Sequence, residues 1–318
     1  MNRIVIFIGS EISFSRTLLA AFLEAIHYRP QITAAAVMET GIVSWHQTLG
    51  QHVLWRVDRF FNPQNPMPEP QSYGSLKRLG AEYDVPVFIS AKNDFHKKDF
   101  CHFITHELNA NLALSLGCLR IYPPGLIDIF DMVVNYHNGA LPAYRGIAAT
   151  GWEVYHGQES VGFAYHRITK EIDEGNILLS DTVPAYDDMS IRRLEAIKTQ
   201  RATQYCGQII EKMIQRDPGS HQNGCSNYFS LQDFLKIRYV GDPGQVSWTE
   251  LQKRIRCFRM AILRIKGQDV PVTEIQQASC RATPHFVTSD NVPGLVKRFF
   301  YLPYALYWAA RKAGMINL

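Results

Sequence analysis

The chain has 318 residues, of which 46% are hydrophobic and 19% charged, so it can bury a sizeable core without disulfides. This composition excludes a chain that is disordered throughout, and the length indicates one large domain with a smaller one, or two comparable domains. The net charge is +4, but residues 210–318 carry 15 Lys/Arg against 8 Asp/Glu. This basic C-terminal part favours an anionic partner, such as a phosphate-bearing small molecule, a membrane surface or a nucleic acid, unless it is simply a solvated surface.

The cysteines indicate a reducing compartment. Six of them are scattered along the chain, with no C-x-x-C pair and no Cys/His cluster at metal-binding spacing. We therefore expect free thiols, no bound metal and a cytoplasmic location. The first residues lack the long apolar segment of a secretory signal, and the longest apolar run, residues 299–310, is shorter than the ~20 residues that span a bilayer.

The first half of the chain alternates apolar runs with helical or loop stretches. Five runs predict strands, at residues 4–8, 32–37, 85–89, 112–116 and 132–136. Residues 15–25 predict a helix with Leu18, Leu19, Phe22 and Leu23 on its apolar side. Near-continuous apolar strands separated by helices predict an α/β fold with a mostly parallel sheet that is covered on both faces.

Extra material, residues 42–73, separates the second and third of these strands. Within it, residues 46–61 predict an amphipathic helix and residues 62–70 an exposed, proline-rich loop.

The rhythm changes after Asn135. Residues 161–168 and 177–183 predict two strands whose connection is too short for a crossover helix, so we expect them to be antiparallel. One long helix is expected to begin after Ser190 and to end before Asp217-Pro218-Gly219. This break divides the chain into a predicted catalytic domain, residues 1–216, and a basic domain for substrate or partner contacts, residues 217–318.

The C-terminal part predicts a smaller, mixed α+β domain. It contains a basic helix at residues 247–258 and strands at 262–265 and 270–275. Residues 296–312 form an aromatic tail with basic flanks, which either rests on a membrane surface or docks on the enzyme body or a second subunit.

The candidate chemistry begins at Asn135 and His137. These residues end an apolar strand and lead into a loop rich in Gly and Pro, at the carboxyl edge of a sheet where open α/β folds bind ligands. Residues two apart on a strand share a face, so the amide and the imidazole can converge on one atom. Such a pair suits charge stabilisation on an oxygen and proton movement, although a turn-capping Asn beside a half-buried His gives the same pattern.

Asp173 lies in the short connection between the two antiparallel strands. A carboxylate near His137 would orient the imidazole and favour its protonated form. Asp, Gly and Asn are also ordinary turn residues, so turn chemistry explains this loop equally well.

These residues together resemble the formyltransferases that use 10-formyltetrahydrofolate. The family pattern is Asn-x-His, Leu-Pro-x-Tyr-Arg-Gly, Trp and Gly landmarks, Gly-x-x-x-His and Asp-x-Gly. This chain has, in the same order, Asn135-Tyr136-His137, Leu141-Pro142-Ala143-Tyr144-Arg145-Gly146, Trp152, Gly157, Gly162-Phe163-Ala164-Tyr165-His166 and Asp173-Glu174-Gly175. The resemblance covers about residues 1–215, is sharpest over 131–180, and implies a Rossmann-like N-terminal domain.

The resemblance also implies roles for individual residues. Asn135, His137 and Asp173 resemble the family's catalytic trio, in which the base role is open between His137 and Asp173. His166 matches a family histidine outside the trio, which we interpret as structural. The backbone of Leu116, Gly117, Cys118, Leu119, Arg120 and Ile121 resembles part of the folate pocket. Substrate contacts are expected from Ser10 and Ser13, in the loop after the first strand, and from Tyr144 and Arg145.

The acceptor amine is less constrained. Asn138-Gly139-Ala140 replaces the Pro-Ser-Leu that is usual in methionyl-tRNA enzymes and is closer to the nucleotide-sugar N-formyltransferases. The expected acceptor is therefore a nucleotide-linked amino sugar for envelope polysaccharide such as lipopolysaccharide. Initiator methionyl-tRNA is the alternative, and formyltetrahydrofolate hydrolysis or an inactive binding module ranks lower.

Other motif classes are absent from the sequence. It has no G-x-G-x-x-G after the first strand and no P-loop, and G-x-S-x-G is also missing. A dinucleotide-binding enzyme, a P-loop NTPase and an α/β-hydrolase are therefore unsupported.

Overall fold

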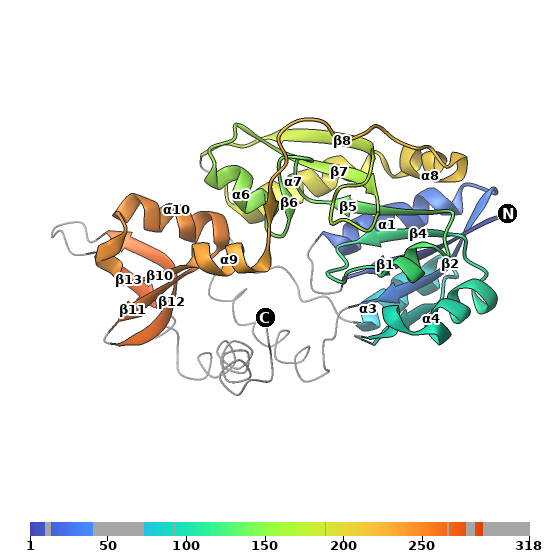
Figure 1. The fold of residues 1–318 in the computed structure, drawn as a ribbon, viewed down its shortest axis with the longest axis horizontal. Helices are drawn as coiled ribbons and strands as arrows, with labels where there is room; N and C mark the ends of the chain where they lie inside the picture. The colour runs from blue at the N-terminus through green and yellow to red at the C-terminus, as the bar shows by residue number, and fades with distance from the viewer. Residues whose placement is uncertain are drawn as a thin grey trace. The chain divides into compact units, whose positions relative to one another are not determined.

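The computed structural model describes residues 1–9, 14–40, 73–91, 93–187, 189–265, 267–277 and 284–288 (Figure 1). By their contacts, the described residues up to 231 form one compact unit and those from 232 onward form another. The expected helix at 46–61, the loop at 62–70 and the aromatic tail lie outside the described residues. The assignment of roles to domains 1–216 and 217–318 stays a prediction.

A seven-stranded sheet organises the first unit, in the order β3-β2-β1-β4-β5-β7-β8. Its strands are β1 (Asn2–Ile8), β2 (Ile32–Glu39), β3 (Val87–Ile89), β4 (Leu112–Leu116), β5 (Met132–His137), β7 (Ser160–Arg167) and β8 (Ile177–Pro184). The first five pair in parallel, whereas β7 runs antiparallel to both β5 and β8. This confirms the predicted α/β class with a mostly parallel sheet, and it confirms the antiparallel pair.

Helices and short turns connect these strands. They are α1 (Ser15–His27), α3 (Tyr73–Glu82), a 3₁₀ turn (Asp94–His96), α4 (Lys98–His102), a π-helical turn (Phe103–Glu107), α5 (Pro124–Ile127), α6 (Ala149–Tyr155), α7 (Ile191–Thr203) and α8 (Cys206–Gln215). A small parallel pair joins β6 (Arg145–Gly146) to β9 (Tyr228–Phe229).

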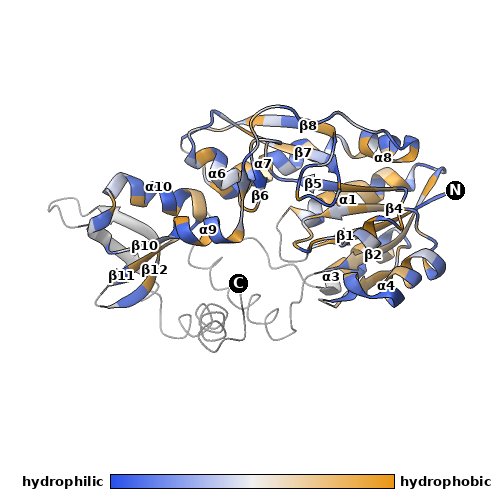
Figure 2. Cartoon of the chain, viewed as in Figure 1, coloured by the Kyte–Doolittle hydropathy of each residue, from blue (hydrophilic) through white to orange (hydrophobic). Residues whose placement is uncertain are grey.

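Two apolar clusters cover the two faces of the sheet, as the continuous apolar strands predict. The ribbons of the central strands β1, β2 and β4 are largely in the hydrophobic colour in Figure 2. Alternate residues of β1 face opposite ways, so Ile4 and Ile6 pack in the cluster that contains α1 and α8. Val5 and Phe7 pack in the other cluster, and the Phe7 ring lies edge-on to Phe95 with the centroids 5.2 Å apart.

The prediction of one long helix is wrong, because the structure has two helices that are separated by a break at Gln204 and Tyr205. Ser190 caps the first one as expected, its hydroxyl accepting from the Arg193 N–H at 3.2 Å. At the break, the Tyr205 hydroxyl donates to an Asp181 carboxylate oxygen at 2.5 Å on β8. This anchor on the edge strand lets α8 begin at Cys206 with its own buried side.

The second unit contains a smaller mixed sheet in the order β10-β11-β12-β13, with β10 and β11 parallel and the other pairs antiparallel. Its elements are α9 (Leu231–Arg238), β10 (Tyr239–Gly241), a 3₁₀ turn (Pro243–Gln245), α10 (Trp248–Phe258), β11 (Ala261–Ile265), β12 (Gln268–Gln277) and β13 (Pro284–Thr288). Leu251 and Ile255 of α10 pack with Leu263 and Val272 in its core. The predicted mixed α+β class, the basic helix and both strands are confirmed.

No helix among the described residues combines the length and the apolarity needed to cross a bilayer.

Candidate active site

Strand β5 places Asn135 and His137 at the carboxyl edge of the parallel strands. The antiparallel register pairs Asn135 with His166 of β7, and His137 with Ala164. His137 is 7% exposed and Asn135 is partly buried. The Asn135 and His137 side chains both lie in a cluster with Asp173 and His166. They therefore share one face of the strand, as their spacing of two residues predicts.

Asp173 bridges the two histidines from the loop between β7 and β8. One carboxylate oxygen, Oδ2, lies 3.3 Å from His137 Nδ1, and Oδ1 lies 3.4 Å from His166 Nε2. The Gly146 N–H donates to Oδ2 at 2.9 Å. The expected catalytic trio is therefore brought together, with His166 between two of its members.

These neighbours keep Asp173 ionised. Burial alone would raise the pKa of its carboxyl, but the facing His137, the contact with His166 and the Gly146 N–H together hold that pKa well below its ordinary value of 3.8. At neutral pH the site therefore holds a carboxylate that can orient His137 and pair with a cation.

The loop after β5 fixes the other side of the His137 ring. Nε2 lies 2.6 Å from the carbonyl oxygen of Tyr144, and a carbonyl only accepts, so Nε2 carries a proton. The peptide bond between Leu141 and Pro142 in this loop is cis. Nδ1 is consequently the ring atom that faces Asp173.

The two predicted substrate contacts in this loop already have partners within the first unit. The Tyr144 ring is buried and stacks on Phe229, with the centroids 5.9 Å apart. The Arg145 guanidinium forms an ion pair with Glu174, beside Asp173. The other two predicted substrate residues, Ser10 and Ser13, lie outside the described residues.

His166 contacts the site residues directly, although the sequence suggests only a structural role for it. Its Nδ1 donates to the Arg167 carbonyl at 2.9 Å, so in the neutral ring Nε2 accepts from the Asn135 amide at 3.1 Å. In the protonated ring Nε2 donates to Asp173 Oδ1, which lies 3.4 Å away. The bond from Asn135 orients the amide and uses one of its two N–H groups. The signal for this role is the register between β5 and β7, which a single sequence does not contain.

Gln222 is a second residue that sequence reasoning missed. Its amide Nε2 donates to the carbonyl oxygens of Asp173 and Gly175, both at 2.8 Å. Asp173 has a left-handed backbone, with φ of 55°, so this clamp supports a conformation that is costly for a residue with a side chain. Gln222 lies in an irregular segment after α8, where no periodicity marks it.

The loop expected to hold the folate begins at the end of β4. Leu116 is fully buried, whereas Leu119 and Ile121 are 73% and 68% exposed. The Arg120 guanidinium donates to the Ser90 hydroxyl at 2.8 Å and to backbone oxygens nearby, so it anchors the loop instead of facing solvent. Two exposed apolar side chains on an anchored loop can pack against the ring faces of a ligand.

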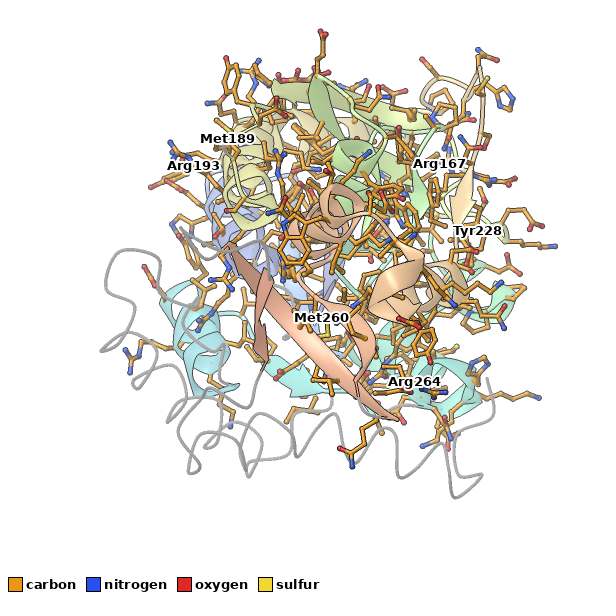
Figure 3. The ribbon with its side chains drawn as sticks, turned by 90° about the vertical axis from the view of Figure 1, so that its left-hand side faces the viewer. Arg167, Met189, Arg193, Tyr228, Met260 and Arg264 are labelled. Atoms are coloured by element: carbon orange, nitrogen blue, oxygen red, sulfur yellow. The ribbon has the colours of Figure 1, made fainter. Side chains whose placement is uncertain are left out.

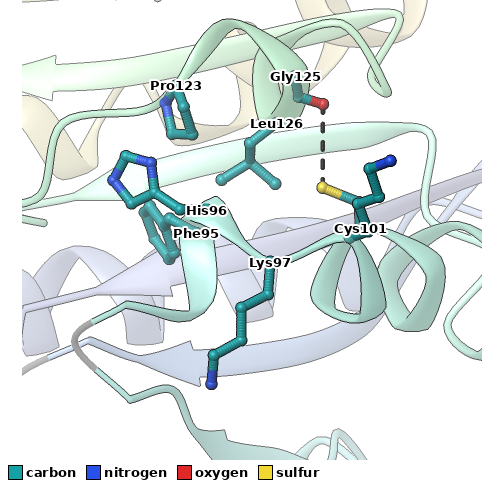
Figure 4. Close-up of a pocket in the computed structure, with 8 residues that line it drawn as sticks. Phe95, His96, Lys97, Cys101, Pro123, Gly125 and Leu126 are labelled. Carbon is teal, nitrogen blue, oxygen red and sulfur yellow. Dashed lines mark hydrogen bonds between the residues drawn. The ribbon is translucent and has the colours of Figure 1, made fainter.

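A separate pocket lies beside the 3₁₀ turn, α4 and α5 (Figure 4). Its lining residues are Phe95, His96, Lys97, Lys98, Cys101, Pro123, Gly125 and Leu126. None of the predicted catalytic residues lines it, so this pocket is not the candidate active site.

Among the described ranges, no group of three or more His, Cys, Asp or Glu side chains is arranged to hold a metal ion.

Comparisons with known proteins match the same part of the chain. A family model described as formyl transferase matches residues 68–207. GDP-perosamine N-formyltransferase of Brucella melitensis is 32% identical over 160 residues, which cover 48% of this chain and 60% of that protein. The match thus spans less than two thirds of this relative.

Solved structures show the same fold. A sugar N-formyltransferase from Shewanella sp. FDAARGOS_354 aligns with a TM-score of 0.60 at 16% identity, over 87% of this chain and 98% of that one. An N-formyltransferase from Helicobacter canadensis aligns with a TM-score of 0.53 at 17% identity, over 87% of this chain and 89% of that one. The latter was solved with folinic acid and dTDP-3-aminofucose.

Proposed function

We propose that this chain, in which residues 68–207 match the formyl transferase family model, transfers a formyl group from 10-formyltetrahydrofolate to the amine of a nucleotide-linked amino sugar. The observation that carries the proposal is the cluster of Asn135, His137 and Asp173 at the carboxyl edge of the sheet, with Asp173 Oδ2 3.3 Å from His137 Nδ1.

Bound 10-formyltetrahydrofolate supplies an activated formyl group whose carbon an amine can attack. The oxygen of that group gains negative charge as the amine adds, and the Asn135 amide has a second N–H to donate to it, since the first is held by His166. The attacking amine must also lose a proton. That proton is accepted between His137 Nδ1 and the Asp173 carboxylate, because Nε2 is already committed to the Tyr144 carbonyl. It would then pass to the folate nitrogen as the bond between that nitrogen and the formyl carbon breaks, which releases tetrahydrofolate.

A folate donor is supported by the loop after β4, where Leu119 and Ile121 expose apolar side chains. The Helicobacter canadensis enzyme, which shares the fold, was solved with folinic acid. The residues of the predicted pocket, 116–121, are proposed to hold the donor through their backbone and through these two side chains.

A nucleotide-linked amino sugar is supported as the acceptor by the names of two relatives. The Brucella melitensis relative is called a GDP-perosamine N-formyltransferase, and the Helicobacter canadensis structure contains dTDP-3-aminofucose. Ser10, Ser13, Tyr144 and Arg145 remain the proposed substrate contacts. Residues 1–216 are proposed as the catalytic domain and residues 217–318 as a basic domain that contacts substrate or partners.

A transfer assay tests the proposal. Purified protein is given 10-formyltetrahydrofolate and a panel of nucleotide-linked amino sugars, and tetrahydrofolate release is followed. We expect release that depends on one amino sugar and that is lost in Asp173→Asn. Release only with charged initiator tRNA would establish the methionyl-tRNA alternative, release without an acceptor would indicate a hydrolase, and no release with any acceptor would favour a binding module.

Location and assembly are a further part of the proposal. We propose a cytoplasmic enzyme that works in envelope polysaccharide synthesis, forms a homodimer and contacts the membrane peripherally through residues 296–318. Deleting that tail and measuring binding to anionic liposomes tests the membrane contact, and unchanged binding would contradict it.

A further inference from the structure

A buried ion pair lies behind the loop that follows His137. Lys198 on α7 and Glu153 on α6 have side chains that are 0% and 1% exposed, and Lys198 Nζ lies 3.5 Å from Glu153 Oε2. Removing two charges from water is costly unless each is paired and hydrogen-bonded. Apolar side chains could fill the same space without this cost. Packing alone therefore does not explain why the pair is there.

Lys198 donates hydrogen bonds to α6, to the turn that follows His137 and to β7. Its Nζ donates to the Thr150 hydroxyl at 2.7 Å, to the Gly162 carbonyl at 2.8 Å and to the Asn138 carbonyl at 3.0 Å. The Thr150 hydroxyl in turn donates to the same Asn138 carbonyl at 3.2 Å. Asn138 directly follows His137, so the cation holds the first peptide group of the turn.

Glu153 holds the other end of that turn. Its Oε1 accepts from the Ala140 N–H at 2.8 Å and from the Gly162 N–H at 2.9 Å. The two charged side chains thus clamp residues 138–140 to one position on β7, Gly162, and use both backbone groups of that glycine. A Cβ at Gly162 would lie 2.8 Å from the Ala140 Cβ, so the turn and the strand are in close contact.

The turn passes this constraint to the His137 ring. The Ala140 carbonyl accepts from the Tyr144 N–H at 2.9 Å, and the Tyr144 carbonyl accepts from His137 Nε2 at 2.6 Å. A Cβ on Gly139 would lie 2.8 Å from His137 Nε2, so the turn also confines the ring sterically. A continuous chain of contacts therefore joins Lys198 and Glu153 to the ring atom that selects the tautomer of His137.

We propose that Lys198 and Glu153 are positioning residues that hold the turn at 138–140, and with it the Tyr144 carbonyl, so that His137 keeps its proton on Nε2 and presents Nδ1 to Asp173. The role in transfer rests on the proposed function, but the effect on the ring does not. Neither residue touches the reacting groups, and both act through the turn.

Two variants separate positioning from stability. Lys198→Met leaves a buried carboxylate without its cation, so it is combined with Glu153→Gln. Thr150→Val removes one hydroxyl from the network while the ion pair stays, and Thr150→Ser restores that hydroxyl. Arg201→Met is the matched control, since Arg201 is a cation on the same helix that pairs with Asp181 and is 47% exposed.

Histidine ¹⁵N chemical shifts give a readout that does not depend on activity. Wild type is expected to show His137 with a protonated Nε2, assigned by comparison with His137→Gln. In the double variant we expect this signal to move towards an average of the two tautomers, with a smaller movement in Thr150→Val and none in Thr150→Ser or Arg201→Met. Transfer assays should show kcat about 10- to 100-fold lower in the double variant and about 3- to 10-fold lower in Thr150→Val, with KM for both substrates within about threefold.

If the ¹⁵N chemical shifts of His137 are unchanged both in a folded Lys198→Met/Glu153→Gln double variant and in Thr150→Val, the proposal is overturned. If the double variant does not fold, the comparison of Thr150→Val with Thr150→Ser decides it in the same way. Changed shifts in a protein that transfers no formyl group to any acceptor would refute the proposed function and leave the positioning role supported.

Discussion

The pKa of the Asp173 carboxyl differs between the folded and the unfolded chain. Its pKa is held below 3.8 by His137, His166 and the Gly146 N–H, against the effect of burial. The unfolded chain therefore binds a proton on Asp173 at a pH where the folded chain does not. A carboxyl whose pKa is lower in the folded chain stabilises the fold at any pH above its pKa in the unfolded chain. This stabilisation is lost as the pH falls through its pKa in the folded chain.

Asp173→Asn should remove this pH-dependent contribution. As the pH falls below about 4, we expect the free energy of unfolding to decrease more steeply in wild type than in the variant, by up to about 1.4 kcal/mol per pH unit. Urea unfolding between about pH 7 and pH 2.5 measures it. The other carboxyls are present in both proteins and cancel in the comparison. Parallel curves would mean that Asp173 does not have a depressed pKa.

His166 is expected to affect turnover through Asn135. His166→Phe keeps an aromatic ring but removes the nitrogen that accepts from the Asn135 amide at 3.1 Å. Leaving a buried polar group without its partner costs about 1–3 kcal/mol, so kcat should fall by about 5- to 150-fold while KM changes little. Steady-state kinetics measure the effect, with His102→Phe as a control for an exposed histidine on α4. Wild-type kcat in a folded His166→Phe would show that Asn135 needs no such support.

At this scale, motif order in the sequence proposed Asn135, His137 and Asp173 as catalytic residues, and the structure brings these three side chains together. It could not identify Gln222 or the orienting role of His166. Both depend on which residues lie opposite each other, which is decided by strand register and by the path of an irregular segment. No local pattern of residue types encodes either of these.

The element that most directly holds the Asp173 loop is the short pair of β6 and β9. Gly146 of β6 donates its N–H to Asp173 and has a left-handed backbone, with φ of 91°. An added Cβ there would lie 2.2 Å from the Phe229 carbonyl oxygen on β9. Tyr228 of the same strand, which is 47% exposed, is labelled in Figure 3.

Gly146→Ala should therefore lower both stability and transfer. The added methyl strains the backbone and displaces β9 or the Gly146 N–H, so we expect kcat to fall by about 100-fold. Gly157→Ala is the matched control, because Gly157 also has positive φ, 75°, but nothing lies within 4 Å of its added Cβ. That control should lose about 1–2 kcal/mol of stability and keep its activity. Thermal unfolding and kinetics of both variants measure this, and full activity in Gly146→Ala would contradict the assigned role of β6.

The elements themselves were largely predictable, for a physical reason. Buried parallel strands need near-continuous apolar runs, and α1 needs an apolar side, so both leave a strong pattern in the sequence. The two-residue strands β6 and β9 are too short for any periodicity. The break between α7 and α8 also leaves no pattern, since it depends on the tertiary bond from Tyr205 to Asp181.

At the scale of the whole molecule, the contacts of the segment that follows α8 place it in the first unit. Residues 217–231 contain Gln222, which holds Asp173 and Gly175, and β9, which pairs with β6. The Phe229 ring stacks on Trp152 with the centroids 4.5 Å apart. The Asp-Pro-Gly stop at 217–219 ends the helix, but the chain continues to pack on the same core beyond it.

Two shortened chains test whether this segment is part of the catalytic unit. A chain of residues 1–231 keeps Gln222 and β9, whereas a chain of residues 1–216 loses both. We expect the longer chain to unfold at a higher temperature, because the shorter one leaves Trp152 and Tyr144 without Phe229 and leaves the left-handed Asp173 without its clamp. We also expect the longer chain to keep more formyl transfer.

Melting curves and the transfer assay compare the two chains, and Gln222→Ala in the full-length protein serves as the matched single change. If residues 232–318 are themselves needed for turnover, both shortened chains lose transfer, but their melting temperatures still differ. Equal melting temperatures, with normal kcat in Gln222→Ala, would show that the catalytic unit ends at 216, as the helix-stop signal in the sequence predicts. A lower melting temperature for the shorter chain would show that an irregular segment without any sequence signature completes the loop that carries Asp173.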